Sequence, residues 1–335
     1  MTDSSADSAA DADADAVARF PGGRVDPADW TTLAGVAADH RGEVQLTPGG
    51  GVLIRRADGM SVGRSELVAA GLASRIADDR LPRILASPLA GRVGGHHDLA
   101  DLPERLHAEL VVRLDSAMID SATLAGGLVV GFDAGSGDVL AHSPDLAVVA
   151  RNGDEVRVHV SGRDTSVELR MADAVTVLAD VTVDLVRAGN VGSGRQGSRE
   201  VHDLVVVALG AHPLASPVGS TAGPVTAATA GPVTAGLTTA ASTPTKLTTA
   251  VEVPRVGWVD TDDGLVSLLS VVPDGIVSAR LAEFLGAVDR PGTISADRVI
   301  GLHALTEAMA EQVVRVLAPM GMIYDAASPW ADGSA

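Results

Sequence analysis

Two histidine groups are the most obvious candidates for metal or acid/base chemistry in this sequence. His96 and His97 have imidazole side chains, which are common metal ligands. They are adjacent, however, and follow a Gly-Gly pair that indicates a loop, so they are poorly placed to bind one ion together. His142 and Asp138 have the residue types of an acid/base pair, but both lie in a segment expected to turn, where polar residues are common. We therefore predict no metal site and no catalytic residue from these groups.

A run of three glycines, Gly49–Gly51, has the composition of a phosphate-binding loop. It lacks the following Lys-Ser/Thr pair and the helix N-terminus that such a loop needs, so we predict a loop or a wide bulge without a bound phosphate. The three tryptophans, Trp30, Trp258 and Trp330, are interpreted as packing residues rather than as a stacking platform.

The chain contains no cysteine. Disulfides, thiolate catalysis and iron–sulfur clusters held by cysteine are therefore excluded for this chain. We expect no cofactor that depends on a thiolate ligand.

The net charge of −18 argues against nucleic acid as a partner, because such binding depends on neutralising phosphates with Lys and Arg. Residues 1–16 are acidic and rich in Ala and Ser, which predicts a disordered leader rather than a signal peptide. No apolar run approaches the roughly 18 residues of a membrane span. We expect a cytoplasmic protein that does not bind membranes.

The sequence repeats one order of elements. Ala18–Pro88 and Val256–Pro329 each run strand, helix, strand pair and helix, and each closes on Ala-Ser-Pro. Self-similarity of this kind indicates a duplicated module. The expected first helices are Pro27–Asp39 and Ser278–Val288, the strand pairs Glu43–Arg56 and Gly292–Leu302, and the second helices Arg64–Ala73 and Thr306–Leu317.

An α/β module separates the two copies. It is expected to contain a helix over Pro103–Met118, a further helix over Ala172–Arg187, and several strands, including Val139–Ala141 and Leu204–Leu209. Residues 211–253 are rich in Ala, Thr, Pro and Gly, which predicts a linker. The expected domains are the leader (1–16), the first copy (17–92), the central module (93–210), the linker (211–253) and the second copy (254–330).

Four segments resemble the precorrin-3B synthase family of aerobic cobalamin biosynthesis, within the nitrite/sulfite reductase superfamily. They are RFPGGR at 19–24, ASPLAG at 86–91, FDAGSGDVLAHSPDLAV at 132–148 and GMIYDAASPW at 321–330. The resemblance implies an α/β (α+β) fold with two ferredoxin-like half-domains in pseudo-twofold pairing, plus a central α/β domain. It also implies a tetrapyrrole and an anionic substrate bound between the halves, beside a four-cysteine [4Fe–4S] cluster.

The resemblance implies that Arg24, Arg55 and Arg298 line the tetrapyrrole cleft, because these arginines match the family at cleft positions. Guanidinium groups form charge-assisted hydrogen bonds with carboxylates, which tetrapyrrole precursors carry. The alternative is that all three are solvated surface arginines.

Other family positions differ. The family's cluster cysteines follow the SPW element, whereas here only Ala331–Ala335 follow it, so we expect the chain to be truncated before the cluster segment. Basic or polar family positions are occupied by Gly49, Gly51, Leu53, Pro82, Gly126 and Gly127, and the family's Arg before ASPLAG is at best shifted by one, to Arg83. Loss of three charged contacts would weaken anion binding by roughly 5–9 kcal/mol.

We therefore expect a precorrin-3B synthase-like protein that is not an active oxidoreductase on its own. The expected partner is a corrin precursor or sirohaem-like tetrapyrrole, bound weakly. The alternatives are a non-catalytic module that binds a tetrapyrrole or docks a cobalamin-pathway enzyme, a subunit of a split oxidoreductase, and a gene remnant without a selected function.

Overall fold

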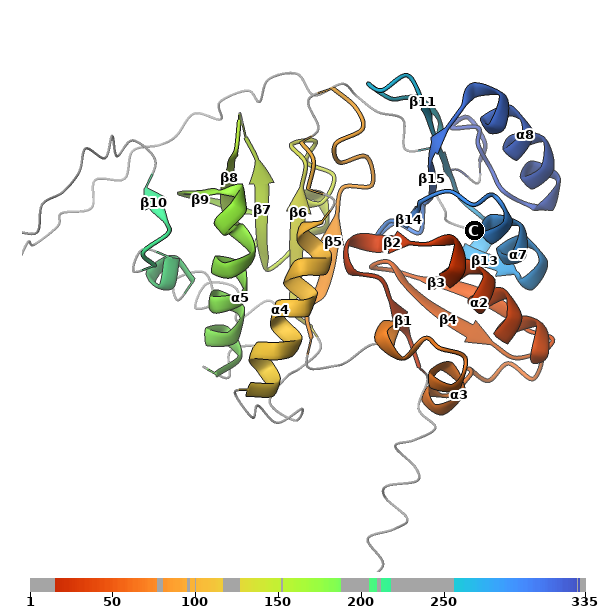
Figure 1. Cartoon of the computed structure of the whole chain (residues 1–335), viewed down its shortest axis with the longest axis horizontal. Helices are drawn as coiled ribbons and strands as arrows, with labels where there is room; N and C mark the ends of the chain where they lie inside the picture. Colours follow the sequence, from red (N-terminus) through yellow and green to blue (C-terminus); the bar gives the residue numbers. More distant parts are fainter. Residues whose placement is uncertain are drawn as a thin grey trace, which may run out of the picture.

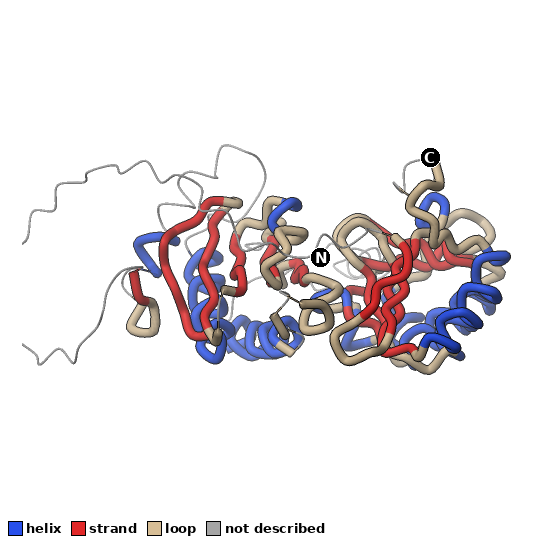
Figure 2. Tube along the Cα trace, turned by 90° about the horizontal axis from the view of Figure 1, so that it is seen from above, coloured by secondary structure: helices blue, strands red, loops and turns tan. Residues whose placement is uncertain are grey.

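The structure is a computed structural model that describes residues 16–76, 81–94, 97–99, 101–116, 127–151, 153–187, 205–209, 212–217, 256–329 and 331. It contains three β-sheets (Figure 1). One sheet with its helices forms one part of the molecule, and the other two sheets lie together in a second part (Figure 2). None of the helices in the described ranges is long and apolar enough to cross a membrane.

The first copy of the repeat begins with a short strand and a tight turn, followed by a well-capped helix. Pro27 occupies the first turn of that helix, and Asp26 and Asp29 form a capping box, in which Asp26 N donates to Asp29 Oδ2 at 3.1 Å. The elements are β1 (Ala18–Arg19), η2 (Pro21–Gly23), β2 (Arg24–Val25), α2 (Pro27–Asp39), β3 (Glu43–Thr47), β4 (Gly51–Arg55), α3 (Arg64–Ala69) and η3 (Ala73–Arg75).

The second copy has the same order of elements after one additional strand. Ser278 and Thr306 cap its two helices by accepting hydrogen bonds from Leu281 N and Met309 N. The elements are β11 (Gly257–Asp260), β12 (Val266–Ser270), η6 (Pro273–Gly275), β13 (Ile276–Ser278), α7 (Ala279–Ala287), β14 (Gly292–Ile294), β15 (Ile300–Leu305), α8 (Glu307–Leu317) and η7 (Ala318–Met320).

The two copies exchange one strand each. The sheet of the first copy has the order β1-β4-β3-β13, and the sheet of the second has β11-β12-β15-β14-β2. Strand β13 pairs with β3, and β2 pairs with β14, so each copy completes the sheet of the other. If β1, β2, β3 and β4 are matched with β12, β13, β14 and β15, the two sheets have the same strand order.

The two copies also share one apolar core. Buried side chains of α2, among them Trp30 and Leu33, belong to the same cluster as Leu281 and Leu285 of α7. The helices approach closely at Gly286, where an added Cβ would lie 2.5 Å from Thr31 Oγ1. Neither copy therefore has a complete sheet or a complete core by itself.

Endoproteinase Lys-C tests this interdependence, because Lys246 is the only lysine of the chain and lies in the predicted linker. We expect a single cut that yields residues 1–246 and 247–335, since a segment rich in Ala, Thr and Pro is a good protease substrate. The fragments should elute together from a sizing column, because β2 and β13 hold them to each other's sheets. Separation of the fragments without denaturant would contradict the exchanged-strand architecture.

The central part is a six-stranded sheet with the order β10-β9-β8-β7-β6-β5. Its strands β5, β6 and β7 are parallel, and the rest of the sheet is antiparallel. Helices α4 and α5 pack against each other over the sheet (Figure 1). The elements are β5 (Arg83–Ala86), α4 (Leu102–Ser116), β6 (Val129–Asp133), η5 (Leu140–His142), β7 (Leu146–Ala150), β8 (Glu155–Val160), β9 (Arg163–Arg170), α5 (Met171–Arg187) and β10 (Ser216–Pro217).

Four features of the central part differ from the sequence predictions. Strand β10, which pairs with β9 of the central sheet, lies within the predicted linker of residues 211–253. The expected strand at Val139–Ala141 is replaced by the 3-10 turn η5. Residues 205–209, expected to be a strand, are helical. Strand β5 lies before the expected boundary at residue 92, yet it pairs with β6 in the central sheet. Most of the predicted leader and linker lies outside the described residues.

Candidate functional site

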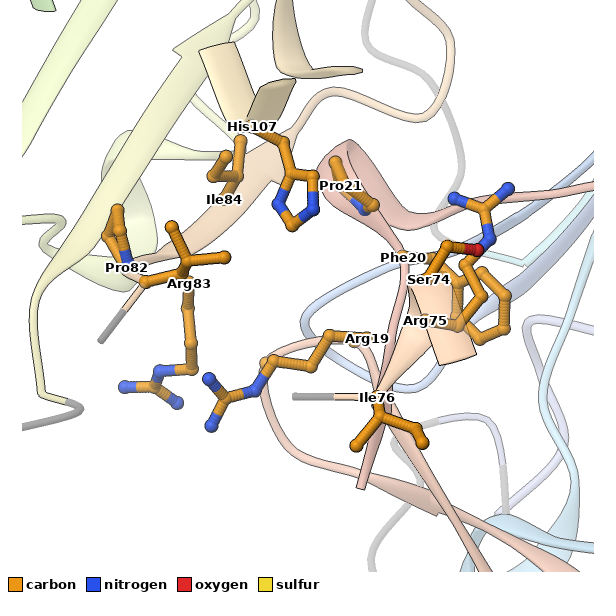
Figure 3. A pocket seen from close by; sticks show the side chains of 13 residues that line it. Arg19, Phe20, Pro21, Ser74, Arg75, Ile76, Pro82, Arg83, Ile84 and His107 are labelled. Atoms are coloured by element: carbon orange, nitrogen blue, oxygen red, sulfur yellow. The ribbon is translucent and has the colours of Figure 1, made fainter. Parts of the chain in front are cut away.

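A cationic cavity lies where the first copy of the repeat meets the central sheet (Figure 3). Its volume is about 30 Å³, and one water needs roughly 10–15 Å³ of such space. No acidic residue lines it. The lining residues are Arg19, Phe20, Pro21, Gly49, Gly50, Ser74, Arg75, Ile76, Leu81, Pro82, Arg83, Ile84 and His107.

Arg19 and Arg83 reach this cavity from two different sheets. Arg19 is the last residue of β1, and Arg83 is the first residue of β5. Their guanidinium groups extend toward the same part of the cavity (Figure 3). The cavity therefore depends on the contact between the first copy and the central part.

The glycine turn makes room for Arg83. Gly49 and Gly50 have φ values of +85° and +77°, which strongly favour glycine, and Gly49 N donates to Ala296 O. A Cβ on residue 49 would lie 2.8 Å from Arg83 Nη1. The guanidinium of Arg83 thus occupies the space beside residue 49, where the resemblance implies an arginine in the family. Arg83, at the start of β5, therefore places a positive charge beside residue 49.

Arg75 and Arg83 differ in how far carboxylates neutralise their charges. Arg75 pairs with Glu104 at 3.0 Å and with Asp29 at 3.4 Å. Burial lowers the pKa of Arg75, but these two carboxylates outweigh it and the pKa is raised. Within the described part of the chain, Arg83 forms no ion pair, and its Nε is buried without a hydrogen-bond partner. The charge of Arg83 does favour the ionised form of Asp145, so this carboxylate neutralises it in part at longer range. Arg83 therefore presents a charge that an anionic ligand can neutralise.

The three predicted site arginines lie elsewhere. Arg24, on β2, lines a second cavity described below. Arg55, on β4, faces Glu43 across the β3–β4 pair. Arg298 lies in the β14–β15 turn with a φ of +63°, and its Nη1 donates to Asp274 O at 3.4 Å, which links that turn to η6. None of the three lines the cationic cavity.

The sequence predictions did not include Arg19. They included Arg83 only as the shifted counterpart of the family's arginine before the ASPLAG segment. The signal for Arg19 was present, since it is the first residue of the RFPGGR segment that carries the resemblance. The approach of Arg83 to Gly49 joins two separate elements of the chain, so an alignment of single positions does not predict it.

The side chains of His142 and Asp138 have structural partners other than each other. His142 pairs with Asp297 at 3.4 Å rather than with Asp138, and Asp138 accepts hydrogen bonds from Ser87 and Ser136. His97 N donates to Ala134 O, and His96 lies outside the described residues. Where the structure describes the chain, no group of three or more His, Asp or Glu side chains could hold a metal ion.

The second cavity has a volume of about 110 Å³ and is lined by residues of η2 and β14. Thr293 lines it, and Thr293 Oγ1 lies 2.9 Å from Nε2 of His303, whose Nδ1 lies 3.0 Å from Ser267 Oγ. Burial, and to a smaller extent the positive charge of Arg92, lower the pKa of His303 to about 3. His303 is therefore neutral over the ordinary pH range.

This burial predicts a pH dependence of stability. Below pH 6.5 the unfolded chain protonates His303, whereas the folded chain resists protonation down to about pH 3. The free energy of unfolding should therefore decrease as the pH falls through this window, with a contribution of about 2 kcal/mol by pH 5. Urea titrations at pH 7 and pH 5 check this, with His303→Gln losing less stability than the wild type over that interval. Equal losses would show that His303 does not carry the effect.

Comparisons with known proteins agree with this architecture. No protein-family model matches the sequence, and no curated protein matches it either. Among solved structures, the NirA protein of Mycobacterium tuberculosis is similar with a TM-score of 0.67 and 15% sequence identity. The match covers 94% of this chain and 58% of NirA, so the chain spans little more than half of that protein's length. The chain therefore has a mixed α/β fold with three sheets that is similar to the fold of NirA.

The [4Fe–4S] cluster implied by the sequence resemblance does not fit this chain. Such a cluster is held by four cysteine thiolates, and the sequence has none. No reaction step is therefore assigned to a cluster bound by these residues.

Proposed function

We propose that this chain is a precorrin-3B synthase-like protein that binds the carboxylates of an anionic tetrapyrrole without oxidising it. Two ferredoxin-like half-domains with exchanged strands form the framework, and Arg19 and Arg83 are the ligand contacts. The single observation that carries the proposal is the meeting of these two arginines in a cavity without an acidic lining residue.

The size of the cavity determines which part of the ligand enters it. A volume of about 30 Å³ has room for two waters or one carboxylate group, not for a macrocycle. The ligand would therefore dock by its carboxylate-bearing edge, with the ring outside. Charge-assisted hydrogen bonds contribute about 1.5–3 kcal/mol each, so two of them correspond to micromolar affinity or weaker.

Sirohaem titration, followed by visible absorbance at low salt, tests the proposal. The wild type should bind saturably, and R19Q/R83Q should bind about a hundredfold more weakly, since two charged contacts are removed. The single variant Arg56→Gln is the matched control, because Arg56 pairs with Asp58 and Glu66 away from the cavity.

The double variant R55A/R298A separates this site from the arginine set that the sequence favoured. It should bind sirohaem as the wild type does. Loss of binding in R55A/R298A with retention in R19Q/R83Q would move the site to the arginines expected from the family. No saturable binding by the wild type would refute tetrapyrrole binding and favour a docking module.

A further inference from the structure

The second cavity has features of an anion site that the tetrapyrrole proposal does not use. Its walls come from η2 and β2 of the first copy, from residues 87–92, which follow β5 of the central part, and from β14 of the second copy. Its volume of about 110 Å³ is several times that of one water. An ion of the size of phosphate or sulfate fits in this space.

Two arginines line this cavity, Arg24 and Arg92. Burial lowers the pKa of Arg92, and the positive charge of Arg24 lowers it further, as expected for two guanidinium groups that line one cavity. Two like charges held together favour an anion placed between them.

The carboxylates around these arginines neutralise them only weakly. Asp26 lies 3.8 Å from Arg24 Nε, and both of those side chains are about half exposed. Such exposed pairs contribute little. Asp263 and Asp98 attract Arg92, but Asp263 is exposed and already accepts hydrogen bonds from Thr261 and Leu265. Asp98 is also exposed, so its attraction for Arg92 is weakened by solvent.

The β2–β14 pairing adds a hydroxyl group to the same face. Arg24 and Thr293 are direct partners in the antiparallel register, so their side chains lie on one face of the sheet. Thr293 Oγ1 lies within hydrogen-bond distance of His303 Nε2, and Ser267 Oγ lies within reach of His303 Nδ1. Because neutral imidazole has one donor and one acceptor, one of these two hydroxyls donates to His303 and the other accepts from it.

We propose that this cavity binds a small oxyanion such as phosphate or sulfate, held by Arg24 and Arg92 and by the hydroxyl of Thr293. In this arrangement Ser267 donates to His303 Nδ1, and His303 Nε2–H donates to Thr293 Oγ1. The O–H of Thr293 then points its hydrogen at the anion. His303 is a positioning residue, because it fixes the hydroxyl without touching the ligand. The proposal goes beyond tetrapyrrole binding and does not depend on it.

Nuclear magnetic resonance titrations of the full chain with sodium phosphate, and separately with sodium sulfate, test this site. The ring ¹⁵N signal of His303, assigned by its loss in His303→Gln, should shift saturably as Thr293 engages the anion. Chloride at equal ionic strength should not produce this shift. Absence of a saturable shift with both oxyanions would overturn the proposal.

Variants locate the binding. Arg24→Gln should weaken phosphate binding at least tenfold, the factor that corresponds to about 1.4 kcal/mol, and it should fold normally because Arg24 is half exposed. Thr293→Val should weaken it severalfold while keeping the side-chain shape. Arg56→Gln is the control that should leave it unchanged. Unaltered affinity in Arg24→Gln, or an equal loss in Arg56→Gln, would show that the anion binds elsewhere.

Discussion

Replacing Gly23 by alanine should destabilise the protein by about 2–5 kcal/mol and weaken the exchange of strands between the two copies. Gly23 has a φ of +75°, a conformation that costs an L-residue roughly 1–2 kcal/mol. An added Cβ would also lie 2.1 Å from the carbonyl oxygen of Ile294, a backbone atom of the partner strand β14. Relief of that clash requires β2 to move away from β14, and overpacking of this kind costs a further 1–3 kcal/mol.

Gly71→Ala is the matched control for this substitution. Gly71 has a φ of +90°, but no atom lies within 4 Å of the position of its Cβ. It therefore measures the backbone strain without the clash, and it should cost about 1–2 kcal/mol. Urea denaturation of both variants gives the comparison. Equal losses in Gly23→Ala and Gly71→Ala would mean that the close approach of β2 to β14 does not matter for stability.

Asp133→Asn should destabilise the central sheet by about 2–6 kcal/mol. The carboxylate of Asp133 is fully buried, and each of its oxygens accepts two backbone hydrogen bonds. Burial and the charge of Asp138 raise the pKa of Asp133, whereas these hydrogen bonds act in the opposite direction. An asparagine would place its NH₂ group against two N–H donors, and each buried donor left without an acceptor costs about 1–3 kcal/mol.

Asp138→Asn provides the control for Asp133→Asn. Every hydrogen bond that the structure assigns to the Asp138 side chain goes to Oδ1, from Ser87, Ser136 and the backbone of Val139. An asparagine can keep that oxygen in place and put its NH₂ group at the Oδ2 position. Thermal unfolding should therefore show a much smaller effect for Asp138→Asn. A similar loss in the two variants would contradict the four-bond account of Asp133.

Local patterns predicted the elements of the repeat well. The helix expected at Pro27–Asp39 has those bounds in the structure, because a proline in the first turn and an acidic cap define its start. The pattern did not predict that β2 and β13 cross to the other copy's sheet. Both are very short strands, and their partners are decided by the packing of α2 on α7, which joins residues far apart in the sequence.

The two wrong strand predictions in the central part have local causes. At Val139–Ala141, the N–H groups of Val139 and Leu140 donate to the carboxylate of Asp133, so they cannot join a strand ladder. In residues 205–209, Val205 and Leu209 are buried while Val207 is 70% exposed. That four-residue spacing of buried positions is helical, and it outweighs the strand preference of valine.

The candidate site was less predictable than the fold. Position-by-position comparison with the family suggested that the cationic positions had been lost at Gly49 and shifted at Arg83. Gly49 has no side chain, however, so it leaves space beside the turn, and the guanidinium of Arg83 occupies that space. The position of Arg83 beside Gly49 results from the contact between the first copy and the central sheet, which an alignment of single positions does not describe.

The most direct test of carboxylate recognition compares sirohaem with its fully methyl-esterified form against the wild-type protein. Esterification keeps the macrocycle and removes the negative charges that Arg19 and Arg83 are proposed to bind. Absorbance titrations at low salt should show saturable binding of sirohaem and at least a hundredfold weaker binding of the ester, since two charge-assisted hydrogen bonds are lost. Equal affinities would contradict the account, because they would show that the ring rather than its carboxylates is recognised.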